Sequence, residues 1–204
     1  MSNLKHLVTI SFILLTFIGC NKPDTTTTYP IGYVHTQMGD MYFWLYDETP
    51  NHKAKFIELA KEKHYDDFSF NRVVKNFVIQ GGCPDSTIFF ENSPYLLEPE
   101  FVDSIGHVYG ALGMGRDGNL GKLSNACQFY IVNKESGLPN LDNEYMIFGQ
   151  LIKGFDVLTA ISNVETDNTD TPLNTIPIEV RTKRFSADKL KKEFDFIVPL
   201  ALKN

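Results

Sequence analysis

The sequence predicts a mainly β protein, an antiparallel barrel or sandwich that carries only two helices. Several short runs of β-branched and aromatic residues have the length and spacing of strands, and clusters of Gly, Asn and Asp separate them. Two segments instead have helical spacing. No motif recurs at a fixed period, which excludes propellers and solenoids. Many short strands with few helices are typical of antiparallel sheets that close on themselves or pack face to face.

The first expected elements are a hairpin and a helix. Residues 31–47 alternate apolar and polar positions on both sides of a break at residues 38–40, as two paired strands do. The segment 48–65 then repeats apolar residues at helical spacing. Thr49 is a candidate N-cap, and Pro50 suits the first helical position because an N–H would be unpaired there anyway. An amphipathic helix of about three turns is therefore expected.

The remaining expected elements are strands and one more helix. The run FNRVVKNFVIQGG at residues 70–82 reads as one buried strand, although it includes the polar residues Arg72 and Gln80. Alternation places Phe77 on the face opposite to these two, unless the strand is irregular at residues 75–76. Later strands are expected at residues 107–114, 127–132, 145–151 and 176–182, with a helix at residues 154–162.

Length and composition limit the classes of function. The 204 residues fit one compact domain with short appendages, and an apolar content of 43% is enough for a substantial core. The formal net charge of -6 argues against a nucleic-acid partner, because that binding relies on clustered Lys and Arg. We expect a monomer.

The first twenty residues predict export. An apolar stretch at residues 7–18 is too short to span a bilayer and is typical of a signal peptide. The sequence TFIGC that ends at Cys20 resembles a bacterial lipobox, so residues 1–19 are expected to be removed and Cys20 to carry lipid. Residues 20–30 would then be a polar tether between the membrane and the domain. The expected location is the cell envelope, facing the periplasm or the outer surface; the alternative is an ordinary cleaved signal with an incidental cysteine.

Two cysteines remain beyond Cys20. Cys83 and Cys127 stand far apart and share no spacing signature, so the sequence leaves their pairing open and slightly favours free thiols. The histidines are scattered, and neither H-x-x-x-H nor C-x-x-C occurs. We expect no metal site and no cofactor.

Three motifs stand in the order in which one known family carries them. FNRVVKNFVIQGG resembles the cyclophilin signature F-H-R-[IV]-[IV]-x-x-F-[MV]-x-Q-G-G, and CQFYIV at residues 127–132 resembles the S-Q-F-[FY]-I strand of that family. LDNEYMIFGQLIKGFDVLTAI at residues 141–161 resembles a third segment. The resemblance implies a closed eight-stranded antiparallel barrel capped by two α-helices. The expected domain spans residues 31–184. The extension that follows, residues 185–204, contains the apolar run FDFIVPLAL and is expected to pack on the barrel rather than on a partner.

The resemblance also implies an activity. Cyclophilins are peptidyl-prolyl cis-trans isomerases, so the chain is expected to isomerise Xaa-Pro bonds in proline-containing polypeptides and to assist the folding of exported proteins. The uncatalysed barrier of this rotation is roughly 18–20 kcal/mol, and no covalent bond is broken. The sequence shows no nucleophile and base in a recognisable arrangement, which fits such a reaction.

The site residues follow from the same motifs. Arg72, Phe77 and Gln80 are the expected catalytic residues. Arg72 would donate to the prolyl nitrogen or to a substrate carbonyl, and Gln80 would orient Arg72 and hold the substrate backbone. The expected substrate-binding residues are Val78, Gly115, Arg116, Gln128, Phe129, Leu141 and Tyr145.

Two loops depart from the family pattern and keep alternatives open. Residues 83–100 contain Phe89 and Phe90 where a glycine-rich loop is usual, and residues 115–126 are longer than usual. Both loops flank the expected groove, so substrate preference beyond proline does not carry over. The alternative function is a cyclophilin-fold module that binds proline-containing segments without turning them over. A barrel that holds a small apolar ligand ranks lower, because small barrels are filled by their own side chains.

Overall fold

A single antiparallel sheet organises the chain, as a computed structural model that describes residues 27–84 and 93–199 shows. The strands within these ranges are β1 (Thr28–Thr36), β2 (Gly39–Leu45), β3 (Ser69–Val74), β4 (Val78–Gly82), β5 (Leu96–Leu97), β6 (Ala111–Gly115), β7 (Ser124–Val132), β8 (Ile147–Lys153) and β9 (Glu179–Ser186). The helices are α1 (Pro50–Lys61), α2 (Phe155–Ser162) and α3 (Ala187–Phe194), with 3-10 turns η1 (His64–Asp67) and η3 (Pro139–Leu141). The expected signal peptide, Cys20, Phe89 and Phe90 lie outside the described residues.

The fold is mainly β, as predicted. Its sheet, however, forms an open half-barrel. Its strand order is β3-β4-β7-β6-β8-β2-β1-β9, with β5 paired to β7. The end strands β3 and β9 form no ladder; the segment before β9 contacts the start of β3 through an isolated bridge between Ser69 and Pro177. Two hydrogen bonds flank this bridge, from the Phe70 N–H to the Ile176 carbonyl at 3.0 Å and from the Ile178 N–H to the Phe68 carbonyl at 3.2 Å. The closed eight-stranded barrel expected from the resemblance is therefore not confirmed, and the sheet has nine strands within the described ranges.

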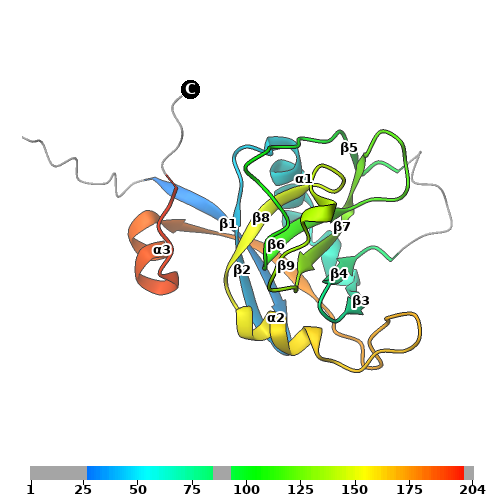
Figure 1. The fold of residues 1–204 in the computed structure, drawn as a ribbon. Coiled ribbons are helices and arrows are strands. Elements are labelled where there is room, and N and C mark those ends of the chain that lie inside the picture. The colour runs from blue at the N-terminus through cyan, green and yellow to red at the C-terminus, as the bar shows by residue number, and fades with distance from the viewer. Residues whose placement is uncertain (1–26, 85–92, 200–204) are drawn as a thin grey trace, which may run out of the picture.

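The two predicted helices cover opposite ends of the sheet (Figure 1). Helix α1 begins at Pro50 as predicted, although the side chain of Thr49 makes no capping hydrogen bond. Helix α2 packs Val157 and Leu158 against the interior. No helix in the described part of the chain is both long and apolar enough to span a bilayer.

A third helix, α3, was not expected from the sequence. It lies beside the outer end of β1 and β9 (Figure 1). The Ser186 hydroxyl caps it by accepting a hydrogen bond from the backbone N–H of Lys189 at 3.3 Å. Leu190 is fully buried in a cluster with Ile31, Trp44 and Phe185. This part of the 185–204 extension thus packs on the sheet.

The sheet extends beyond the domain limits expected from the sequence. Strand β1 begins at Thr28, inside the segment expected to be a tether, and Thr28 is the cross-strand partner of Ser186. Strand β9 correspondingly continues past residue 184. This pairing places the beginning of β1 beside the end of β9, so the first and last strands of the sheet meet there.

The inner face of the sheet is covered by side chains of the strands and of helix α1. Phe56, Phe70, Phe129 and Phe148 are fully or almost fully buried in the main core cluster. The ring of Phe56 lies 5.2 Å from that of Phe148 and 6.3 Å, edge to face, from that of Phe129. These aromatic rings fill the described core with side chains.

Residues 70–82 form a hairpin, so the interpretation as one strand was wrong. Strands β3 and β4 are joined by a turn at residues 75–77, and Asn76 has the left-handed φ of 58°. Asparagine tolerates this conformation better than most residues because its side chain is short and polar. Arg72 and Gln80 consequently stand directly opposite each other on neighbouring strands.

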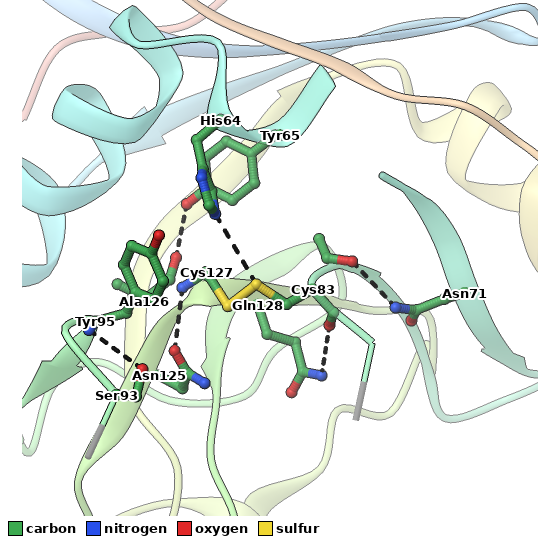
Figure 2. Close-up of a disulfide and its surroundings, with 11 residues drawn as sticks. His64, Tyr65, Asn71, Cys83, Ser93, Tyr95, Asn125, Ala126, Cys127 and Gln128 are labelled. Atoms are coloured by element: carbon green, nitrogen blue, oxygen red, sulfur yellow. Dashed lines mark hydrogen bonds between the residues drawn. A yellow bond between two sulfur atoms is a disulfide. The ribbon is translucent and has the colours of Figure 1, made fainter. Parts of the chain in front are cut away.

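Cys83 and Cys127 form a disulfide, which corrects the preference for free thiols (Figure 2). Cys83 follows the end of β4, and Cys127 lies in β7, which pairs with β4. The Cys83 N–H donates to the Cys127 carbonyl at 2.9 Å, and the two Cα atoms are 5.5 Å apart. Sequence spacing could not show this, because strand pairing creates the proximity.

Reduction of this disulfide should destabilise the domain. The bond closes a long loop, so breaking it should lower the free energy of unfolding by roughly 2–4 kcal/mol. Urea unfolding with and without dithiothreitol measures the difference. A Cys83→Ser/Cys127→Ser variant should be insensitive to the reductant. Equal unfolding midpoints for the oxidised and reduced wild type would contradict this prediction.

Candidate active site

A pocket of ≈ 210 Å³ lies beside the β3–β4 hairpin. Its walls bring together residues from four distant parts of the chain, and nine of the ten predicted site residues are among them. The residues that line it are Arg72, Phe77, Val78, Gln80, Gly115, Arg116, Gln128, Tyr130, Leu141 and Tyr145. The structure therefore places the motif residues around one cavity.

Arg72 and Gln80 lie together at the rim because β3 and β4 pair there. The Arg72 guanidinium carbon is 5.9 Å from the centre of the Phe77 ring, so its charge stands next to an apolar wall. Its Nε is 3.8 Å from the carboxylate of Asp170, which belongs to the loop before β9. The Asp170 carbonyl accepts from the Val73 N–H at 2.8 Å, and this holds the loop against β3. Sequence reasoning missed Asp170, since no motif links it to Arg72.

Asn133 fixes the turn that presents Phe77. The Phe77 N–H donates to Asn133 Oδ1 at 2.9 Å, and the Asn133 N–H donates to the Phe77 carbonyl at 3.0 Å. Asn133 Nδ2 also donates to the Val74 carbonyl at 3.2 Å. These bonds span both sides of the turn, so Phe77 reaches the pocket although simple alternation along one strand placed it on the other face. Asn133 follows the end of β7 and was also missed.

Tyr130, rather than Phe129, contributes the aromatic floor. Phe129 is fully buried in the main core, whereas Tyr130 lines the pocket beside Val78. Neighbouring residues of a strand point to opposite faces, so the motif alignment was correct in position but assigned the wrong aromatic residue to the pocket. The Tyr130 ring packs edge to face with that of Tyr145 at 6.4 Å.

A buried hydrogen-bond chain holds the Tyr130 ring. Its hydroxyl lies 2.7 Å from His107 Nε2, and His107 Nδ1 lies 2.7 Å from the Asp142 carboxylate. Burial lowers the pKa of His107, while the bonded Asp142 opposes this. Burial also raises the pKa of Tyr130 well above its usual value, so the hydroxyl stays neutral. This chain of hydrogen bonds holds the Tyr130 ring in place, and the group that reaches the pocket is an uncharged hydroxyl.

The opposite wall combines a guanidinium and an amide. The Arg116 guanidinium carbon lies 4.9 Å from the Tyr145 ring centre, and Nη2 is 3.8 Å from the Glu144 carboxylate. A hydrogen bond from Lys122 lowers the pKa of Glu144 and keeps that carboxylate ionised. Gln128 is buried, and its Nε2 donates a hydrogen bond to the Cys83 carbonyl at 3.0 Å. This wall offers hydrogen-bonding groups to an extended chain that crosses the pocket.

The pocket has the features of a site that binds and polarises a peptide. Its floor is apolar and aromatic, and two guanidinium groups stand at its edges. Among the described residues that line it, none is a Ser, Cys, His or carboxylate. Such a site can hold a small apolar ring and donate hydrogen bonds to the amide groups on either side of it.

Substitution of Gly113 by alanine should displace Tyr130. A Cβ at Gly113 would lie 2.1 Å from Cζ of Tyr130, and His107 holds that ring in place. We expect the free energy of unfolding to fall by about 1–3 kcal/mol, as is typical of overpacking, and the ring to shift into the pocket. Urea unfolding and a crystal structure of the variant measure both effects. Gly118→Ala is the matched control, because nothing lies within 4 Å of a Cβ there; equal effects in both variants would contradict the steric explanation.

Known proteins share this fold and these sequence features. Residues 32–182 match the family model of the cyclophilin type peptidyl-prolyl cis-trans isomerases. A peptidyl-prolyl cis-trans isomerase of Arabidopsis thaliana is 35% identical over 157 residues, which cover 74% of this chain and 90% of the relative. A protein of Staphylococcus saprophyticus named as a putative peptidyl-prolyl cis-trans isomerase is 33% identical over 175 residues, covering 72% of this chain and 87% of its own length.

A solved structure shows the same likeness. A cyclophilin-type isomerase of Cryptosporidium parvum, crystallised in the presence of the dipeptide Ala-Pro, superposes with a TM-score of 0.66 at 28% identity. The match covers 75% of this chain and 98% of that one. With the family model matching most of the chain and the pocket formed by the family motifs, the chain belongs to the cyclophilin-type peptidyl-prolyl cis-trans isomerases.

Proposed function

We propose that this pocket catalyses cis/trans isomerisation of Xaa-Pro bonds in exported proteins, with Arg72 as the principal donor. Peptidyl-prolyl isomerisation is the function of the family to which the chain belongs. The observation that carries the assignment to this site is the cross-strand position of Arg72 and Gln80 above an apolar pocket. Substrates are proline-containing polypeptides, and the domain acts as a monomer.

Catalysis requires the loss of amide resonance. The C–N bond before proline has partial double-bond character, and rotation about it has a barrier of roughly 18–20 kcal/mol. A donor to the prolyl nitrogen favours the pyramidal form, in which the C–N bond is nearly single. The Arg72 guanidinium remains charged and offers several donors in a fixed geometry. Its place beside Phe77 puts this charge next to an apolar ring, where water is partly excluded and the hydrogen bond is stronger.

The rest of the pocket holds the two ends of the rotating bond. Phe77, Val78 and Leu141 would grip the proline ring, with Tyr130 beneath it. Gln128 and the backbone at Gly115 and Arg116 would hold the chain that precedes the proline, and the Tyr145 hydroxyl would bond a substrate carbonyl. With the ring fixed, only the preceding carbonyl needs to turn. No covalent bond forms or breaks, so no proton needs an acceptor.

Replacement of Arg72 tests the catalytic assignment. We expect Arg72→Ala to lower the isomerisation rate by about 10²–10³-fold, the loss typical of removing one transition-state donor. Arg72→Lys should recover part of the rate, since it keeps the charge but loses the planar fork. The measurement is refolding of a protein whose slow step is proline isomerisation.

Arg184→Ala is the control for this test, because Arg184 is exposed on β9 and bonds Thr28, away from the pocket. Equal rates for wild type and Arg72→Ala, both above the uncatalysed rate, would exclude Arg72 as the donor. A wild-type chain that binds proline peptides without accelerating refolding would favour the alternative, a non-catalytic binding module.

We also propose that the domain is tethered to the cell envelope through a lipid on Cys20, facing the periplasm or the outer surface. The lipobox-like TFIGC sequence supports this. The disulfide between Cys83 and Cys127 is a second supporting observation, because disulfides persist in oxidising compartments. Since β1 begins at Thr28, the tether between lipid and sheet would be short and the domain would stay close to the membrane surface.

Removal of Cys20 tests the anchor. The Cys20→Ala chain should lose incorporation of labelled fatty acid and move from the membrane fraction to the soluble fraction of a bacterial cell. A Cys83→Ser/Cys127→Ser variant should keep the label, since those cysteines belong to the folded domain. Unchanged labelling of Cys20→Ala would refute lipidation at this residue.

A further inference from the structure

Three potential metal ligands meet outside the active-site pocket. His64 Nε2 lies 3.9 Å from Cys83 Sγ, and the ligand atoms of His64, Cys83 and Cys127 all lie within 4.8 Å of one another. Figure 2 shows the imidazole directed at the disulfide. We propose that these three residues form a binding site for Zn²⁺ when the disulfide is reduced.

The donor set is one that zinc prefers. Two thiolates and one imidazole, with water in the fourth position, give a tetrahedral Cys₂His site. With Zn–S bonds of about 2.3 Å and Zn–N bonds of about 2.0–2.1 Å, neighbouring ligand atoms in a tetrahedral site stand on the order of 3.5 Å apart. The observed Nε2 to Sγ distance is already close to this. Once the sulfur–sulfur bond is broken, only small side-chain rotations are needed.

The backbone keeps the three ligands together without the disulfide. The Tyr65 hydroxyl donates to the Ala126 carbonyl at 2.7 Å, which joins η1, the element that carries His64, to β7. The Cys83 N–H donates to the Cys127 carbonyl at 2.9 Å, which joins the end of β4 to β7. The pairing of β4 with β7 continues from there to Val78. The site is therefore assembled by the fold and does not depend on the covalent bond.

Aromatic contacts hold the imidazole in its orientation. The His64 ring lies 5.7 Å from the ring of Tyr65, 5.5 Å from Phe68 and 5.0 Å from Tyr95. A ring fixed on three sides loses little freedom when it binds an ion. Cys127 is almost fully buried and Cys83 is partly buried.

The disulfide and the metal exclude each other because they use the same sulfur atoms. A dithiol reductant transfers two electrons and two protons to the disulfide and becomes a cyclic disulfide itself. Zinc then displaces the two thiol protons as it binds the thiolates. The cluster thus has an oxidised, metal-free state and a reduced state that takes zinc. In the disulfide state the Cys83 carbonyl accepts a hydrogen bond from Gln128, a residue of the pocket. The cysteine cluster therefore adjoins the pocket through Gln128.

No sequence pattern indicates this site, because the ligands come from separate elements. His64 belongs to η1, Cys83 follows β4, and Cys127 lies within β7. Metal motifs are recognised by short spacings within one segment, and none occurs here. The expectation of no metal site rested on those spacings alone.

The test is zinc binding by the full chain with Cys20→Ser, in which Cys83 and Cys127 are the only thiols. The chain is reduced with a dithiol, desalted under anaerobic conditions and titrated with Zn²⁺ against a chromophoric chelator. We expect one tightly bound equivalent per chain in the reduced form and none in the oxidised form. Replacement of Zn²⁺ by Co²⁺ should give a thiolate-to-metal charge-transfer band, which identifies the sulfur ligands.

His64→Ala should weaken zinc binding by more than about 100-fold, beyond the loss expected for a residue that only supports a ligand. His35→Ala is the matched control, because His35 is exposed and bonds Asp40 away from the cluster. Circular dichroism of the reduced chain establishes that the fold persists. Zinc binding that is equal in the oxidised and reduced chains, equal in His64→Ala and wild type, or lost because the reduced chain unfolds would each overturn the proposal.

Discussion

The pairing of β4 with β7 is the contact on which the site depends. Its register sets Val78 opposite Val132, Gln80 opposite Tyr130 and Gly82 opposite Gln128. One ladder therefore delivers the polar rim, the aromatic floor and the amide wall of the pocket. The same ladder ends where Cys83 meets Cys127 and where Phe77 meets Asn133. A shift of one residue would turn every one of these side chains to the other face.

The two faces of this strand pair perform different tasks. Ile79, Phe129 and Ile131 point into the main core, whereas Val78, Tyr130 and Val132 form a second cluster on the opposite face. The pocket lies on that second face, outside the packed interior. Core packing can therefore hold the strands rigid while the pocket stays open to a polypeptide. This division explains how a sheet whose described inner face is packed with side chains can carry a pocket on its other face.

The sequence identified most of this arrangement through motifs, and its failures have physical causes. Arg72, Gln80, Gln128 and Tyr145 were located because their spacing within each motif is fixed by strand geometry. Phe129 was assigned to the pocket because two aromatic residues adjoin in the motif, and only the strand register decides which one faces the core.

Side-chain contacts between distant segments could not be predicted from local sequence patterns. Asn133 and Asp170 act on the pocket through hydrogen bonds or charge from residues distant in the chain, and no local pattern encodes such a contact. The disulfide was missed for the same reason. The pocket also depends on two glycines that have no side chain. A Cβ at Gly113 would collide with Tyr130, and a Cβ at Gly115 would lie 2.1 Å from Gln128 Oε1. Side chains of β7 lean over the bare backbone of β6, so these glycines are needed for close approach rather than for flexibility.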